Sequence, residues 1–298
     1  MARLALSPLP PDRAEADLLV LPVAAGQAGP VAPPVTAAVL ERLGADLAAV
    51  AGPLTGKLDD VVLVPGYGAL AAPAVLLVGV GPEDERTAET LRRAAAVAVA
   101  AAGKATTMAV ALHRAGLPDP PDHPGPAADG AALAAVAEGT ALAAYRFSRH
   151  KSAPDPDLEA ATLLVDGDRS LAAAEPVVRR AEVAAQATVA ARDLVNEPAS
   201  RINPATLAAE AVRLAKGAGL EHRVLAGPAL RRGRFGAVLA VGGGSATGPR
   251  LVELRYRPGA GPRSRPSAAP ARPRRSRRPG SPPPRPCRPS CPPCRRRA

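Results

Sequence analysis

Three cysteines, the residues best suited to hold a metal or form a disulfide, lie close together near the end of the sequence. Their spacing is Cys287-x3-Cys291-x2-Cys294, and the first 260 residues contain no cysteine. A structural zinc site takes four ligands, but no further cysteine or histidine follows Cys294. We therefore predict that these thiols form no zinc site and that the first 260 residues hold no cysteine nucleophile.

The four histidines are the other candidate ligands and general bases. They are His113, His123, His150 and His222. None is paired with another histidine or an acid at the spacing that places two metal ligands on one face of a predicted helix. The chain also lacks the G-x-S-x-G pattern of a serine hydrolase. We predict that all four histidines are ordinary surface residues.

Two glycine-rich stretches could bind phosphate through backbone amides. GVGPEDE (Gly79 to Glu85) ends a predicted strand, but its three acids would repel a phosphate and instead complement the dipole of the helix that follows. GGGSATGPR (Gly242 to Arg250) leads from one predicted strand to another and has no lysine after its last glycine. We interpret the first as a strand-to-helix turn and the second as a tight connection.

Short apolar runs alternate with alanine-rich stretches along the first part of the chain. The runs are continuous, as in strands that are covered on both faces. The predicted strands are Asp17–Val23, Val61–Val64, Ala74–Gly81 and Thr107–Leu112, and the predicted helices are Val35–Ala51, Thr87–Ala102 and Ala128–Phe147. This order predicts an α/β fold, with a mixed, mostly parallel sheet between two layers of helices.

The next part of the chain predicts a second domain that is only begun. A strand, ATLLVDG, precedes a long helix from about Pro176 to Val195, which ends where Pro198 disfavours helical geometry in Glu197. Another helix starts at Asn203-Pro204, an N-cap followed by proline at the first helical position, and stops at Gly217. Two further strands, Phe235–Gly242 and Arg250–Tyr256, are too few to close an α/β domain of usual size.

Charge divides the chain near residue 260. The whole sequence carries +11, but residues 261–298 hold 12 Arg, 12 Pro and no Lys, Asp or Glu, which leaves −1 for the first 260 residues. This tail has no Leu, Ile, Val, Met or aromatic residue, so we predict that it is disordered. The tail contains only Arg, Pro, Ser, Ala, Gly and Cys, which G/C-rich codons can encode. Such a composition is expected when a GC-rich gene is read out of frame. A genuine basic interaction tail is the alternative.

Three stretches of the first 258 residues resemble the cytosol (leucyl) aminopeptidase family. AEGTALAAYRFSRHKS (Ala137 to Ser152) resembles its Glu-Gly, Tyr-x-Phe and Lys-Ser pattern. ARDLVNEPASRINPATLAAEA (Ala191 to Ala211) resembles the start of its catalytic domain, with Ser200 in place of an expected asparagine. FGAVLAVGGGSATGPRLVELRYRP (Phe235 to Pro258) resembles the segment before its metal site.

The resemblance implies a definite domain organisation. It implies an N-terminal α/β domain over residues 1–165, a linker helix with an incomplete metallopeptidase domain over 166–258, and the tail over 259–298. The family releases N-terminal residues from peptides with two divalent metal ions, zinc or manganese, and is typically hexameric. A cytoplasmic location is implied, and neither a signal peptide nor a membrane span is expected.

The residues that carry the family's chemistry have no counterpart in this sequence. The family's Gly-Lys-Gly-x-Thr-Phe-Asp-Ser-Gly-Gly block should follow soon after Tyr256, but no Asp, Glu, Lys or His occurs beyond Gly261. We therefore assign no catalytic, metal-binding or substrate-binding residue, expect no bound metal, and do not expect the family hexamer. The chain is then an aminopeptidase by descent that is inactive as written. The alternative is a non-catalytic α/β module whose basic tail binds nucleic acid or other anionic partners.

Overall fold

The computed structural model of the chain describes residues 2–50, 52–118, 126–152 and 157–257, without the side chains of 126–128 and 169. The predictions for the three cysteines, His123 and the tail therefore lie outside the described residues. The chain forms two compact units, one of residues 1–207 and one that begins at Ala208. The domain boundary predicted after residue 165 stays a prediction.

The first unit is built on the mixed, mostly parallel sheet that the apolar runs predict. Its strand order is β1-β7-β6-β2-β5-β4. The edge strand β4 runs antiparallel to β5, the short β3 pairs antiparallel with the end of β2, and the other pairs are parallel. The strands are β1 Arg3–Ser7, β2 Leu18–Gly26, β3 Gly29–Val31, β4 Val61–Pro65, β5 Ala74–Gly79, β6 Thr107–Val110 and β7 Ala160–Leu164.

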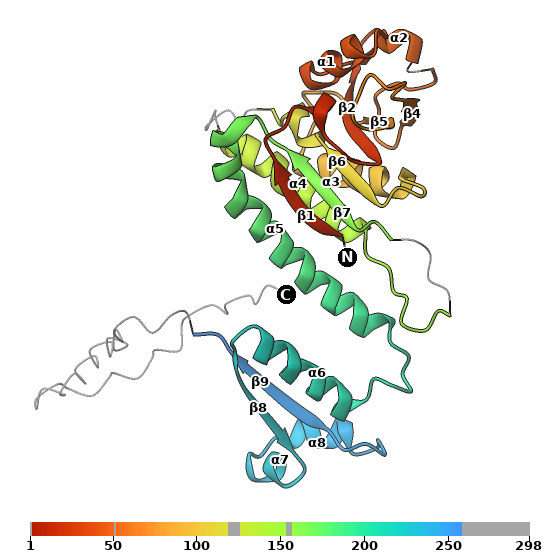
Figure 1. The fold of residues 1–298 in the computed structure, drawn as a ribbon. Helices are drawn as coiled ribbons and strands as arrows, with labels where there is room; N and C mark the ends of the chain where they lie inside the picture. The colour runs from red at the N-terminus through yellow and green to blue at the C-terminus, as the bar shows by residue number, and fades with distance from the viewer. Residues whose placement is uncertain (1, 51, 119–125, 153–156, 258–298) are drawn as a thin grey trace, which may run out of the picture. The chain divides into compact units, whose positions relative to one another are not determined.

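Helices cover both faces of this sheet, which makes three layers (Figure 1). Alternate residues of β2 serve the two cores: Leu19 and Leu21 pack against α1, and Val20 belongs to the core beneath α3, α4 and α5. The elements are α1 Pro34–Arg42, α2 Leu47–Val50, α3 Ala88–Ala101, α4 Pro126–Ala143, α5 Gly167–Asn196, and the 3-10 turns η1 Pro11–Arg13 and η2 Leu112–Ala115.

Helices α3 and α4 approach closely at one glycine. A Cβ atom added at Gly139 would lie 2.3 Å from the backbone oxygen of Arg92, so only glycine permits this spacing. Beside it, the Arg92 guanidinium donates to Glu138 from Nε and Nη2 at 3.1 and 3.0 Å. The Glu138-Gly139 pair of the motif Ala137 to Ser152 therefore holds α4 close against α3.

Three local predictions for the first unit are corrected by the structure. β4 is not a buried strand, because it forms the sheet edge and leaves Leu63 61% exposed. The long helix α5 begins at Gly167, before Pro176, because its buried residues Ala174 and Val178 continue the packed face across the proline. The first strand, β1, was missed because its five residues form too short an apolar run.

The second unit contains a two-stranded antiparallel sheet, with β8 paired to β9. Its elements are most of α6 Pro204–Gly217, then β8 Glu221–Ala226, α7 Pro228–Arg232, α8 Gly236–Gly242 and β9 Arg250–Arg255. The Asn203 side chain accepts from the Thr206 amide at 3.1 Å, while Thr206 Oγ1 accepts from the Asn203 amide at 2.8 Å, which confirms the predicted N-cap of α6.

The strand predicted over Phe235–Gly242 is wrong, since these residues form helix α8. A short apolar run cannot be assigned to strand or helix from periodicity alone, and its alanines and leucine favour the helix. The strand that pairs with β9 is β8, whose polar first half does not stand out in the apolar pattern. The glycine-rich stretch after Gly242 therefore connects a helix to a strand.

Candidate functional site at the ends of helices α4 and α5

Two of the three motifs that carry the family resemblance meet in one polar cluster of the first unit. Tyr145, just after α4, donates its hydroxyl to Asp193 Oδ1 at 2.8 Å and accepts from Asn196 Nδ2 at 3.2 Å. Arg192 Nη1 donates to the Leu142 carbonyl at 3.1 Å, and its guanidinium lies 5.9 Å from the centre of the Tyr145 ring. The last turn of α5 is thereby fixed to the end of α4.

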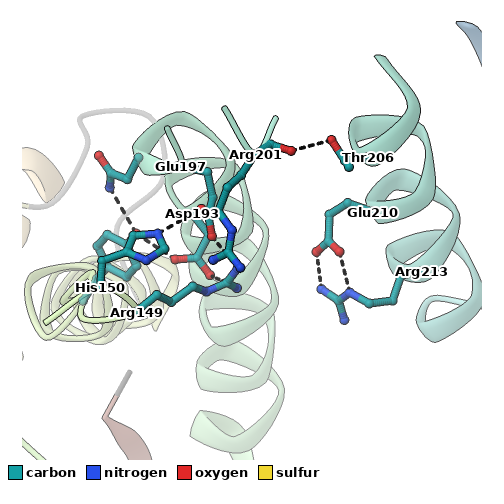
Figure 2. A network of polar contacts seen from close by, with 10 residues as sticks. Arg149, His150, Asp193, Glu197, Arg201, Thr206, Glu210 and Arg213 are labelled. Atoms are coloured by element: carbon teal, nitrogen blue, oxygen red, sulfur yellow. Dashed lines mark hydrogen bonds and ion pairs between the residues drawn. The ribbon is translucent and has the colours of Figure 1, made fainter. Parts of the chain in front are cut away.

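Two basic residues extend the cluster to the end of α5 (Figure 2). Arg149 lies between two carboxylates, with Nη1 3.0 Å from Glu197 Oε1 and Nη2 3.4 Å from Asp193 Oδ2. His150 Nε2 lies 3.1 Å from the other oxygen of Glu197. Glu197 directly follows the helix, where Pro198 ends it as predicted, so the ion pairs hold the residue at which the chain leaves α5.

The electrostatics of the cluster follow from these contacts. The hydrogen bond with His150, and then that with Arg149, lowers the pKa of Glu197. Partial burial, together with the neighbouring Asp193 carboxylate, raises the pKa of Tyr145. Glu197 is therefore an ionised anchor, and Tyr145 is a neutral hydrogen-bond donor and acceptor.

The contacts described for the cluster are structural ones. The Tyr145 hydroxyl, the Arg149 guanidinium and the His150 ring each pair with a carboxylate at the end of α5. Within the part of the chain that the structure describes, no group of three His, Cys, Asp or Glu side chains could hold a metal ion. What the arrangement can do is fix the geometry of the loop after α4 and the end of α5.

The histidine prediction holds for some residues and fails for one. His222 is exposed on β8, and His150 has a side chain that is 41% exposed and paired with Glu197. His113 is different, because its Nδ1 is buried without a hydrogen-bond partner, and burial, aided by Arg114, lowers its pKa to about 4. The structure therefore corrects the surface assignment of His113, which lies in η2 just after the central strand β6.

The two glycine-rich stretches also have structural roles. Gly79 ends β5, and a Cβ there would lie 1.8 Å from the Lys57 carbonyl oxygen, so this turn is a site of close backbone approach. At Gly242 an added Cβ would lie 2.5 Å from Pro249 Cβ. Both observations support the interpretation of tight connections rather than phosphate loops.

Comparison with known families covers both units of the chain. Residues 33–154 match the family model for the N-terminal domain of the cytosol aminopeptidase family, and residues 189–269 match the model for that family's catalytic domain. The polar cluster lies where these two matches approach each other along the chain. The chain is thus an α/β protein of two-domain aminopeptidase type, and it belongs to the cytosol aminopeptidase family.

Individual relatives agree with this assignment. A probable cytosol aminopeptidase of Streptomyces coelicolor is 35% identical over 278 residues, which cover 86% of this chain and 51% of that protein. The bottromycin maturation enzyme BotP in complex with Mn has a TM-score of 0.63 at 32% identity, over 82% of this chain and 46% of its own. A tomato leucine aminopeptidase mutant, at 21% identity, shares the fold, with a TM-score of 0.70 over 85% and 50% of the two chains.

The chain thus spans about half the length of the relatives that it matches. None of the helices in the described residues has both the length and the apolar composition needed to cross a membrane.

Proposed function

We propose that this chain corresponds to the front part of a metal-dependent leucyl aminopeptidase that acts on peptides in the cytoplasm, and that this polypeptide does not itself hydrolyse them. One observation carries the proposal. The chain matches the family from the N-terminal domain into the catalytic domain, yet its residues 261–298 contain no Asp, Glu, Lys or His.

The donor set does not fit a pair of divalent metal ions. Zinc takes cysteine, histidine and carboxylate ligands, and manganese prefers carboxylates, carbonyls and water. The described residues offer no group of three such side chains, and beyond Gly261 only the three cysteines could coordinate a metal. BotP is known in complex with Mn, but the described residues of this chain offer no comparable set of ligands.

The residues of the polar cluster support a structural role, which is to hold the end of α5 in place. The Tyr145–Asp193 and Arg149–Glu197 contacts fix the end of α5, which is where the match to the catalytic domain begins. A partly buried cluster joined by several charge-assisted hydrogen bonds is suited to hold a single geometry. We propose that its function is to hold the loop after α4 and the last turn of α5 in one geometry.

Catalysis is tested on the purified, mass-verified 298-residue polypeptide. Hydrolysis of leucine amide is followed with added Mn²⁺ or Zn²⁺, with and without a chelator, and a full-length relative assayed in parallel is the positive control. The proposal predicts a rate equal to the buffer blank in every condition. Chelator-sensitive hydrolysis by this polypeptide would show that it builds a metal site after all.

The origin of the tail is a separate part of the proposal. We propose that residues from about 259 onward are read out of frame, because the quoted family motifs end at Pro258, the match to the family model ends at residue 269, and the tail uses only residue types that G/C-rich codons can encode. The second candidate, an α/β module that binds nucleic acid, has the 12 arginines of the tail in its favour. The chain has no aromatic residue beyond Tyr256 to stack on bases.

Removal of residues 259–298 separates these alternatives. If the tail is accidental, the shortened chain keeps its stability and loses only non-specific, strongly salt-dependent binding to single-stranded and duplex oligonucleotides. If the tail is functional, its removal abolishes an affinity that differs between nucleic-acid sequences at fixed salt. A scrambled tail of the same composition is the matched control, because it keeps the charge and removes any sequence-dependent contact.

A further inference from the structure

A cavity of about 470 Å³ lies in the first unit, at the carboxyl ends of β6 and β7. The chain leaves β2 toward α1 on one face of the sheet and leaves the adjacent β6 toward α4 on the other face. Adjacent strands whose connections diverge in this way define a switch point, where open α/β sheets bind ligands. The cavity adjoins the first turns of α4 and α5, whereas the polar cluster lies at the last turns of the same helices, and the cavity does not depend on the proposed function.

The walls of the cavity are mostly apolar and come from both helical layers. They include Val35 of α1, Leu133 of α4, Val165 after β7, and Ala174 and Val177 of α5. A volume of this size falls in the range of about 300–1,000 Å³ that holds small organic molecules. The site therefore suits a compact apolar or aromatic body rather than an ion alone.

Arg114 is the basic side chain on the cavity wall, and its ion-pair partner Asp166 is exposed to solvent. Arg114 forms an ion pair with Asp166, and its side chain is 22% exposed while that of Asp166 is 70% exposed. An exposed carboxylate in such a pair contributes little stability and is readily resolvated. A carboxylate or phosphate of a ligand could replace Asp166 and give the more buried guanidinium a planar, two-point partner.

Other features around the cavity also favour negative charge. The N-termini of α1 and α5 adjoin it, and neither Pro33 nor Asp166 caps its helix with a side-chain hydrogen bond. Behind the wall at Gly116, the buried Arg86 donates to backbone carbonyls and forms an ion pair with no carboxylate of the described residues. The other acid, Asp129, is exposed at the rim, where salt screens it.

A polar group on the wall lacks a partner. His113 lines the cavity, and its buried Nδ1 has no hydrogen-bond partner in the described structure. Buried polar atoms without partners are rare in native proteins, and each calls for an explanation such as local strain, a functional role or a bound water or ion. In a neutral ring that donates from Nε2, Nδ1 accepts a hydrogen bond, so a hydroxyl or N–H on a ligand would satisfy it.

We propose that this cavity is a binding site for a small organic anion, namely a carboxylate or phosphate monoester carried by an apolar or aromatic body. Arg114 holds the anionic group, the uncapped ends of α1 and α5 face it, and the walls around Leu133 and Val177 enclose the body. The site would let the N-terminal unit sense a metabolite independently of peptide hydrolysis.

The test uses probes that share one phenyl body and differ in their charge. Hydrocinnamate, hydrocinnamyl alcohol and hydrocinnamyl amine are titrated into the full chain, together with phenyl phosphate to separate the two anionic headgroups. Binding is followed through the ring resonances of the histidines, of which the chain has only four, and a His113→Gln variant assigns the His113 signal. The anions are expected to bind in the millimolar range or tighter and to shift that signal, and the alcohol and amine to bind at least about tenfold more weakly.

Three variants decide where the anion sits. Arg114→Gln should weaken anion binding about tenfold or more, whereas Asp166→Asn, which removes the competing carboxylate, should strengthen it several-fold. Arg93→Gln is the matched control, because Arg93 pairs with Asp59 at 3.3 Å on the surface of α3 and should leave binding unchanged. The proposal is overturned if no anion shifts the His113 signal, if the amine binds as tightly, or if Asp166→Asn weakens binding.

Discussion

Replacing Gly139 by alanine tests the claim that the Glu138-Gly139 pair sets the distance between α3 and α4. The added Cβ would meet the Arg92 carbonyl oxygen at 2.3 Å, more than 1 Å closer than an ordinary contact. Because both partners belong to helix backbones, the helices must separate, and overpacking of this kind costs about 1–3 kcal/mol. Alanine recovers up to about 1 kcal/mol of helix propensity, so we expect a net loss of about 1 kcal/mol.

The matched control lies on the same helix. A Cβ at Gly130 would meet only Val177 Cγ2, at 4.0 Å, so Gly130→Ala should keep the propensity gain and stabilise α4 by up to about 1 kcal/mol. Urea denaturation, followed by circular dichroism, should therefore show Gly139→Ala with a midpoint lower by about 0.5 M and Gly130→Ala with a midpoint that is equal or higher. If Gly139→Ala proves as stable as Gly130→Ala, the close approach does not constrain these helices.

Three further substitutions test other contacts of the first unit. Thr36→Val should lower the free energy of unfolding by about 1–3 kcal/mol in urea denaturation, because the Pro22 carbonyl loses the buried hydroxyl that donates to it at 2.6 Å. An unchanged midpoint would show that this hydrogen bond is dispensable. Tyr145→Phe should cost about 1 kcal/mol through its bonds to Asp193 and Asn196, whereas Tyr67→Phe, at a residue 83% exposed, should cost nothing. Hydrogen bonds from Thr106 and then Thr107 lower the pKa of Asp17 from 3.8 to about 2. The contribution of ionised Asp17 to the free energy of unfolding is therefore complete above pH 3.8 and lost toward pH 2, and after a discount for exposure it is about 1 kcal/mol. Asp17→Asn should remove this part of the acid sensitivity.

The apolar runs were sufficient to predict the sheet of the first unit, because its central strands are buried on both faces. β2 and β5 lie in the middle of the sheet and read as continuous apolar segments. The same rule failed for β4, whose Val-Val-Leu-Val run is equally apolar but occupies the edge. Position within a sheet depends on the order of the strands, which a local pattern does not contain.

The second unit shows the other limit of local patterns. The run at Gly236–Gly242 is short and apolar enough for either structure; it forms a helix, while β8 is the strand that pairs with β9. The helix N-cap at Asn203, in contrast, was predicted correctly, because a cap is made by residues within one turn of each other.

The polar cluster could be predicted as two separate motifs but not as one site. Tyr145 and Asp193 are 48 residues apart, and only the packing of α4 against α5 brings them to 2.8 Å. His113 illustrates the same point, since neither its neighbours in sequence nor its spacing indicates that the cavity and Leu164 surround it. Its burial depends on how β6, β7 and three helices meet.

The most direct test of the central claim is to re-sequence the coding DNA from the Tyr256 codon onward and to translate all three forward frames. The account predicts that another frame encodes a Gly-Lys-Gly…Phe-Asp-Ser-Gly-Gly block directly after β9, which would identify the parent as a two-metal aminopeptidase. A confirmed DNA sequence in which no frame contains that block would contradict the account, and the Arg/Pro-rich tail would then be the protein's own.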